Sequence, residues 1–84
     1  MRDGEPVSEE DLATGQRLAS SRAAAGMSQR RAAEALGVAQ SRIAKLETGA
    51  RRLLFSEAVA FARLYGVSLD ALAGSVGTDV AGSD

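Results

Sequence analysis

The sequence predicts an all-α domain of five short helices. Apolar residues recur at spacings of three and four in successive segments, and no segment shows the alternation typical of a strand. The chain has 84 residues, 45% of them hydrophobic, which is enough for one small globular domain. We expect a flexible acidic arm over residues 1–7, a folded domain over 8–74 and a disordered tail over 75–84.

The first helix is expected to begin after Ser8 and to continue to about Ala25. Ser8 followed by Asp11 resembles a capping box, in which the serine hydroxyl accepts from a backbone N–H of the first turn. Leu18 and Arg22 share a face with Ala25, so Arg22 should point toward the core. A buried cation needs a partner, because an unpaired charge inside a protein is very costly.

The second helix is expected to begin at Ser28, whose hydroxyl can cap it. Its apolar face is narrow and consists of Ala32, Ala33 and Leu36. Gly37 should end it, because glycine adopts the left-handed conformation without a Cβ clash. Val38 then has to point inward. The small alanine side chains allow this helix to approach its neighbour closely across so short a turn.

The third helix is expected to run from about Gln40 to Thr48 and to end at Gly49. One side of it carries Ala39, Ile43, Leu46 and Glu47. The other side is small, polar and cationic and consists of Gln40, Ser41, Arg42, Ala44, Lys45 and Thr48. Such a face can lie in the major groove of DNA, where Gln pairs with adenine and Lys donates to guanine. A solvated helix face is the alternative for this pattern taken alone.

The inner face of the third helix offers a partner for Arg22. Glu47 is the plausible acid, and we predict an Arg22–Glu47 ion pair that ties the first helix to the third. The role of such a pair would be orientation, because buried pairs add little net stability. Two independent surface charges are the alternative.

The remaining segments are expected to close the core. Leu53, Leu54 and Phe55 are too apolar for an exposed loop and should be buried. Ser56 should cap a fourth helix to about Tyr65, with a buried face of Ala58, Phe61, Ala62 and Tyr65. Ser68 should cap a fifth helix through Ala73, and its core residues would be Leu69 and Leu72.

The charge distribution favours a polyanionic partner although the net charge is −1. Residues 12–65 hold nine cations against three acids, a local charge of +6. Local charge sets affinity for a phosphate backbone. The cations expected to contact phosphates are Arg17, Arg30, Arg31, Arg51 and Arg52. For Arg51 and Arg52, which follow the third helix directly, solvated linker charges are the alternative.

The residues that most enzymes and metal sites use are missing. The chain contains no histidine and no cysteine, so the commonest general base, thiolate nucleophile and zinc ligands are excluded. We therefore expect no catalytic residues, no metal and no cofactor. No apolar run approaches the roughly 20 residues of a membrane span, and the acidic N-terminus is unlike a signal peptide. We expect a cytoplasmic protein.

The chain resembles the phage-repressor (Cro-like, xenobiotic-response-element) helix-turn-helix family over about residues 16–74. The matching residues are Arg22, MSQ at 27–29, Ala33, LGV at 36–38, QS at 40–41, Ile43, LETG at 46–49 and GVSLDAL at 66–72. The resemblance implies a five-helix lambda-repressor-like DNA-binding domain. It implies the same Arg22–Glu47 pair. Ala39 departs from the pattern, because a Ser or Thr cap is common there.

The resemblance also implies roles for particular residues. Gln40, Ser41 and Lys45 would read bases, and Gln29 would hold a phosphate. Arg42, Ala44 and Thr48, on the same exposed side, are candidates for base or backbone contacts. The implied function is a sequence-specific regulator of transcription, a repressor, that binds double-stranded DNA as a homodimer.

Two alternatives belong to other classes. The chain could be an antitoxin whose main partner is a toxin or another regulatory protein, with the acidic arm and the glycine-rich tail folding on that partner. It could also be a degenerate domain used only for dimerisation. Co-purification of a second small protein would indicate the first alternative, and failure to bind any duplex at low salt would indicate the second.

Overall fold

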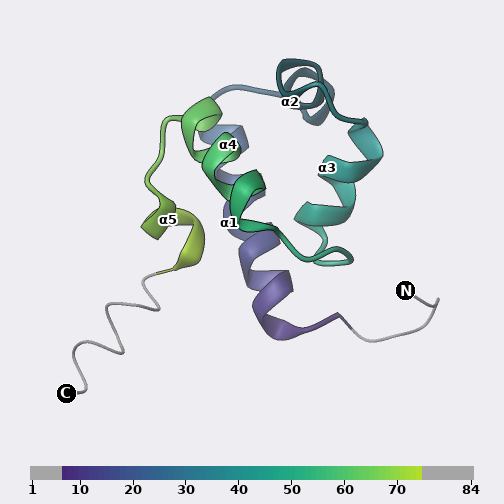
Figure 1. The fold of residues 1–84 in the computed structure, drawn as a ribbon, viewed down its shortest axis with the longest axis vertical. Helices are drawn as coiled ribbons and strands as arrows, with labels where there is room; N and C mark the ends of the chain where they lie inside the picture. The colour runs from purple at the N-terminus through teal and green to yellow at the C-terminus, as the bar shows by residue number, and fades with distance from the viewer. Residues whose placement is uncertain (1–6, 75–84) are drawn as a thin grey trace.

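The computed structural model describes residues 7–74, which form five α-helices and contain no strand (Figure 1). The helices are α1 (Glu9–Ala24), α2 (Gln29–Leu36), α3 (Gln40–Glu47), α4 (Phe55–Tyr65) and α5 (Leu69–Ala73). The predicted all-α class is therefore confirmed. The tail predicted for 75–84 lies outside the described residues, and so does the arm predicted for 1–7 apart from Val7.

Three of the helices begin at the serines that the sequence singled out. Ser8, Ser28 and Ser68 each accept a hydrogen bond from the backbone N–H three residues later, at 3.0, 3.0 and 3.1 Å. Each bond satisfies one of the donors that a helix start leaves without a partner. The cap position of α3 is occupied by Ala39, which makes no side-chain hydrogen bond to the helix, as the sequence led us to expect. Gly37 ends α2 with φ +70° and so makes the left-handed turn into α3.

The start of α4 differs from the prediction. The helix begins at Phe55, so Ser56 lies inside its first turn and is not the cap. Leu54 occupies the cap position, and its backbone N–H donates to the carboxylate of Glu57 at 2.9 Å. A glutamate three residues after the cap commonly makes this reverse bond. This bond satisfies the backbone N–H of Leu54, and no side chain at the cap position accepts from the first turn of α4.

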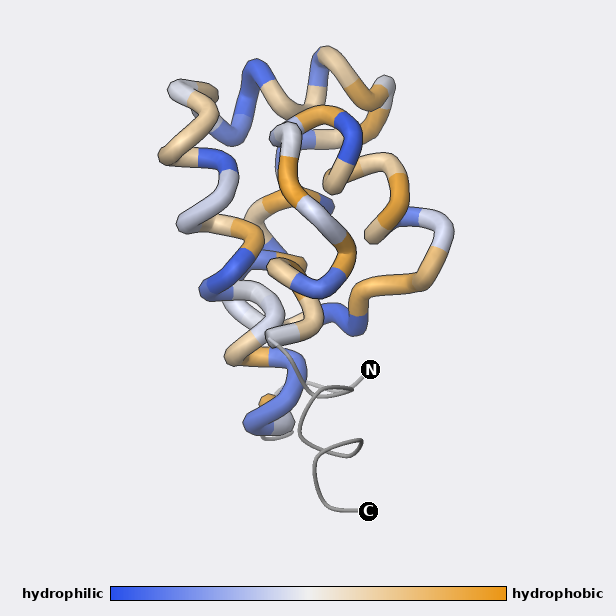
Figure 2. Tube along the Cα trace, turned by 90° about the vertical axis from the view of Figure 1, so that its left-hand side faces the viewer, coloured by the Kyte–Doolittle hydropathy of each residue, from blue (hydrophilic) through white to orange (hydrophobic). Residues whose placement is uncertain are grey.

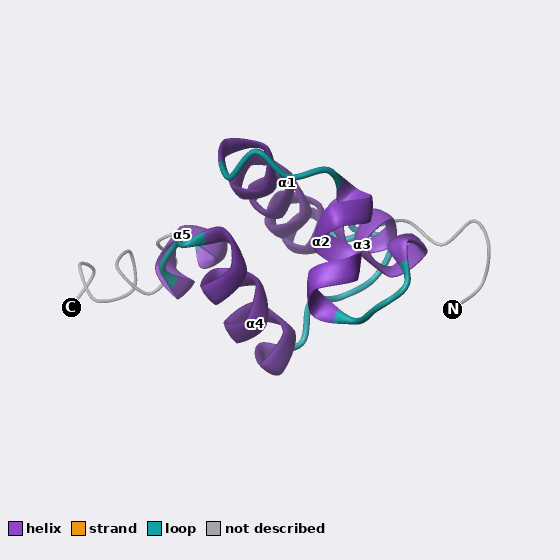
Figure 3. Ribbon diagram, turned by 90° about the horizontal axis from the view of Figure 1, so that it is seen from above, coloured by secondary structure: helices purple, strands orange, loops and turns teal. Residues whose placement is uncertain are grey.

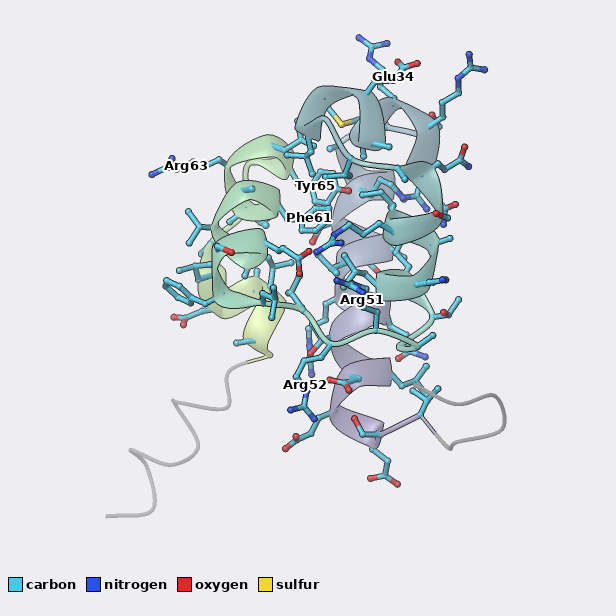
Figure 4. All side chains as sticks on the ribbon, turned by 45° about the vertical axis from the view of Figure 1, so that its right-hand side comes forward. Glu34, Arg51, Arg52, Phe61, Arg63 and Tyr65 are labelled. Carbon is cyan, nitrogen blue, oxygen red and sulfur yellow. The ribbon has the colours of Figure 1, made fainter. Side chains whose placement is uncertain are left out.

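The core lies where α1, α2, α3 and α4 meet, and α5 closes it. Its buried apolar residues are Leu18, Ala32, Ala33, Ile43, Leu46, Phe61, Ala62, Tyr65 and Leu72. Figure 4 shows Phe61 and Tyr65 directed from α4 into this interior, and their ring centroids lie 5.5 Å apart. In Figure 2 hydrophobic and hydrophilic residues alternate along the helices. No helix among the described residues is long and apolar enough to cross a membrane.

Three apolar side chains predicted to fill the core do not do so. Leu54, Phe55 and Leu69 are exposed, and Phe55 retains 75% of its accessible surface. Ala25, predicted to share the inner face of α1, is also exposed because the helix ends before it. Leu53 is partly buried and packs against the core as expected. An apolar surface thus remains at the start of α4.

Helices α1 and α3 cross closely at Gly15, which is buried. A Cβ added there would lie 2.5 Å from the carbonyl oxygens of Leu46 and Glu47. Those two residues form the last turn of α3. Only glycine leaves room for this crossing, which therefore sets the distance of α3 from the long first helix.

Candidate nucleic-acid interface

Helix α3 has one buried side and one exposed side, as its sequence pattern predicted, but Ala39, which was expected on the buried side, is exposed. Ile43 and Leu46 are almost fully buried against the core. Gln40, Ser41, Lys45 and Thr48 are exposed, and Ala44 is partly exposed. In Figures 1 and 3, α3 and α5 lie on opposite sides of the molecule. The exposed side of α3 is therefore a surface distinct from the one around α5.

The exposed side continues into the loop that follows α3. Ser41, Lys45 and Arg51 line one shallow hollow with Val38, Arg42 and Glu57. Figure 4 shows Arg51 on the loop between α3 and α4. The structure thus brings together two candidate base-reading residues and one candidate phosphate contact. No ion pair involves Lys45 or Arg51 within residues 7–74.

Arg42, on the flank of α3, is paired with α4. Its Nε donates to Oε2 of Glu57 at 2.7 Å, and the same carboxylate caps α4 through Leu54. Burial raises the pKa of Glu57, but hydrogen bonds from Leu54 and Arg42 outweigh burial and leave that pKa below its ordinary value. Arg42 therefore joins α3 to α4, and a contact with DNA would have to compete with this pair.

On the inner side, α3 is joined to α1 and α2 through Glu47. The structure contains the expected ion pair: Arg22 donates to the Glu47 carboxylate from Nε at 2.7 Å and from Nη2 at 3.1 Å. The hydrogen bond to Glu47 raises the pKa of Arg22 and outweighs the effect of burial. Arg22 Nη1 also donates to the carbonyl of Met27 at 2.7 Å, which fixes the α1–α2 turn.

Gln29, the expected phosphate contact on α2, is part of this cluster. Its side-chain amide donates to Oε1 of Glu47 at 2.9 Å. A glutamine amide has two N–H donors, so one can bind Glu47 while the other remains for a phosphate oxygen. The Glu47 bond would then hold the amide in place.

The other candidate cations lie in different surroundings. Arg30 lies 3.5 Å from Glu34 on the exposed face of α2, where Arg31 is also exposed. Arg52 lies 3.6 Å from Asp11 of α1. Arg17 lies against the end of α5 beside Gly74, and so on the side of the molecule away from α3. Arg17 is therefore not brought together with the α3 surface.

Glu57 is the residue of this site that the sequence pattern did not reveal. It holds Arg42 of α3 through a contact between two separate helices, and it caps its own helix α4 through Leu54, three residues before it. One signal was present, because a glutamate at the third helical position is typical of a helix start. That signal would have placed the cap at Leu54.

Two helices joined by a tight glycine turn, with the second helix anchored inside and polar outside, define a helix-turn-helix domain. Comparisons with known proteins agree. A family model described as helix-turn-helix matches residues 18–72. The chain belongs to the phage-repressor (Cro-like) helix-turn-helix family.

A solved structure shares the fold. The crystal structure of the restriction-modification controller protein C.AhdI from Aeromonas hydrophila is similar, with a TM-score of 0.72 and 26% sequence identity. The match covers 77% of this chain and 98% of that chain. No curated protein sequence matches the chain. Together the family and the structural match make this chain a DNA-binding regulator of transcription.

Proposed function

We propose that the chain represses transcription by binding, as a homodimer, two half-sites about one helical turn apart, roughly 34 Å. Helix α3 would enter the major groove, where Gln40, Ser41 and Lys45 read base edges. Arg42, Ala44 and Thr48, on the same helix, would contact bases or backbone at its margins. Of these three, Arg42 is held by Glu57 and so would contribute least.

The phosphate contacts would come from both sides of α3. Arg51 is the strongest candidate, because it shares the hollow of Ser41 and Lys45. Gln29, Arg30 and Arg31 lie on α2, which precedes the α3 helix, and Arg52 neighbours Arg51. We assign Arg17 no contact, because it lies beside α5.

The single observation that carries the proposal is the α3 surface itself. It is exposed, cationic and built from short polar side chains on a helix whose other side is buried. The structural similarity to a restriction-modification controller protein also supports a regulatory role.

Selection of bound sequences from a random duplex pool tests the proposal and would show whether the site is palindromic. Binding of variants to the selected duplex then distinguishes base contacts from phosphate contacts. Lys45→Ala should reduce discrimination between the site and a mismatched site by about 1–3 kcal/mol. Arg51→Ala should weaken all duplexes alike and lower the salt slope by about 0.9.

Arg63→Ala is the matched control for both changes. Arg63 is an exposed cation on α4, and Figure 4 shows it pointing away from the α3 surface. The control should leave affinity almost unchanged. If all three variants behaved alike, the proposed division between base and phosphate contacts would be wrong.

A further inference from the structure

An acidic side chain lies in the surface that is proposed to face DNA. Among residues 7–74, the hollow beside α3 is lined by one acid, Glu57, and by the cations Arg42, Lys45 and Arg51. A carboxylate in this place would repel the phosphates of any duplex, because like charges brought together in an interface are unfavourable. Glu57 therefore opposes the positive charge of the surface to which it belongs.

Both oxygens of the Glu57 carboxylate are already engaged. Oε2 accepts from Nε of Arg42 at 2.7 Å, and Nη2 of Arg42 pairs with the same oxygen. Oε1 accepts from the backbone N–H of Leu54 at 2.9 Å, which is the bond that caps α4. The carboxylate cannot follow Arg42 toward DNA without breaking this cap. Arg42 would therefore have to leave Glu57 behind in order to reach a phosphate.

The Arg42–Glu57 pair is not needed to orient α3. That helix is already held by its buried apolar side and by the hydrogen bonds of Glu47 to α1 and α2. The Arg42 and Glu57 side chains are 34% and 15% exposed, and ion pairs that stay in contact with water add little stability. The main effect of the pair is therefore on the charge of the hollow, where Glu57 cancels the charge of Arg42.

We propose that Glu57 restrains sequence-independent binding to DNA, because it holds Arg42 away from the phosphates and cancels its charge. The inference rests on the proposed function, since it requires the α3 surface to face DNA; Arg42, the weakest contact there, then makes none in the wild type. Sequence-independent affinity depends on how many phosphates a protein neutralises. Withholding one cation lowers affinity for every duplex by the same factor, so the base contacts of Gln40 and Lys45 supply a larger share of the binding free energy. Weaker backbone binding also shortens the time spent on non-cognate DNA, because affinity changes within one interface act mostly on dissociation.

Glu57→Gln tests the restraint, with affinities for the selected duplex and for a mismatched duplex measured by fluorescence anisotropy over a series of salt concentrations. Glutamine keeps an oxygen for the N–H of Leu54, so α4 should keep its start and the helical circular dichroism should be unchanged. The variant frees Arg42 and should bind both duplexes about 3- to 15-fold more tightly at about 50 mM salt. The slope of log affinity against log salt should steepen by about 0.9 for each copy bound. Discrimination between the two duplexes should stay the same.

Two further variants show whether the gain comes from Arg42. The double variant Arg42→Ala with Glu57→Gln should lose the gain and return to the salt slope of the wild type. A double variant with a lower salt slope than the wild type would show that Arg42 already contacts phosphates, and would overturn the proposal. Asp70→Asn is the matched control, because it removes one negative charge from an exposed position on α5, which lies on the side of the molecule opposite α3 (Figure 1). Salt screens charges that are so placed, so this control should leave affinity almost unchanged.

The outcomes separate this inference from the proposed function. If the wild type discriminated between the duplexes and Glu57→Gln bound no more tightly, the restraint would fail alone. It would also fail if Glu57→Gln gained affinity only for the selected duplex, because Arg42 would then read a base. If the wild type bound all duplexes alike and Glu57→Gln gained affinity through Arg42, the proposed function would fail and the restraint would stand. If neither protein bound any duplex, both would fail.

Discussion

Replacing Glu47 with Ala tests whether the Arg22–Glu47 pair holds α3 against α1. The Glu47 carboxylate is only 7% exposed. It accepts hydrogen bonds from two nitrogens of Arg22 and from the amide of Gln29. The substitution would remove all three bonds and leave the guanidinium of Arg22 in a largely buried place without its carboxylate.

Removing one member of a buried pair costs about 3–5 kcal/mol, because the remaining charge is uncompensated. The free energy of unfolding of a domain of this size is about 4–13 kcal/mol, at about 0.05–0.15 kcal/mol per residue. Glu47→Ala should therefore remove a large share of the stability. At about 4–8 °C per kcal/mol, the melting temperature should fall by about 12–40 °C.

Urea unfolding followed by circular dichroism gives the free energies. The control is Glu34→Ala, whose carboxylate is 63% exposed and lies 3.5 Å from Arg30. That exposed helix pair should cost no more than about 0.5 kcal/mol. The double variant Arg22→Met with Glu47→Leu should be far more stable than the single Glu47 change, since neither charge then stays buried. A cost below about 1 kcal/mol for Glu47→Ala, in the range of surface pairs, would refute the reasoning.

Three other changes test packing and titration. In urea unfolding, Gly15→Ala should lower the free energy of unfolding by about 1–3 kcal/mol, because the added Cβ would meet the α3 backbone. At a helix position with free space around it, the same substitution would instead raise the free energy of unfolding by about 0.5–1 kcal/mol. Tyr65→Phe should preserve stability at neutral pH, because the buried hydroxyl has no partner among the described residues. Burial raises the pKa of Tyr65 from 10.0 to about 12, so the wild type should lose stability across that range and the variant should not. The pKa of Glu57 is lowered from 4.5, so its stabilisation is present above pH 4.5 and is lost as the pH falls through the folded value. Glu57→Gln should therefore flatten the fall of stability in acid, measured by thermal unfolding across that range.

Local rules were sufficient for most of the fold. The serine caps at Ser8, Ser28 and Ser68 and the glycine at Gly37 depend only on neighbouring residues. The spacing of apolar residues placed Ile43 and Leu46 on the buried side of α3 because that side repeats every three to four residues. These features depend only on residues within one helix and at its ends, so they can be predicted from the sequence.

Features that depend on two helices were harder to predict. Nothing in the spacing within α1 shows that Gly15 meets the end of α3. The hydrophobicity of Leu54 and Phe55 favours burial, but it does not show that the start of α4 leaves both side chains exposed. The sequence likewise shows that Arg42 is on the flank of α3 but not that Glu57 reaches it from α4.

The α3 helix is held on two sides, and this limits what it can offer to DNA. Glu47 joins it to α1 and α2, and Arg42 joins it to α4. The strong hydrogen-bonding groups left for bases are then Gln40 and Lys45, since Ser41 is a weaker reader. At about 1–3 kcal/mol for each good base contact, one copy would discriminate by about 2–6 kcal/mol, whereas specific regulators reach about 4–10 kcal/mol. Two copies would cover that range, so selectivity of this small domain should depend on pairing as much as on the helix that reads the bases.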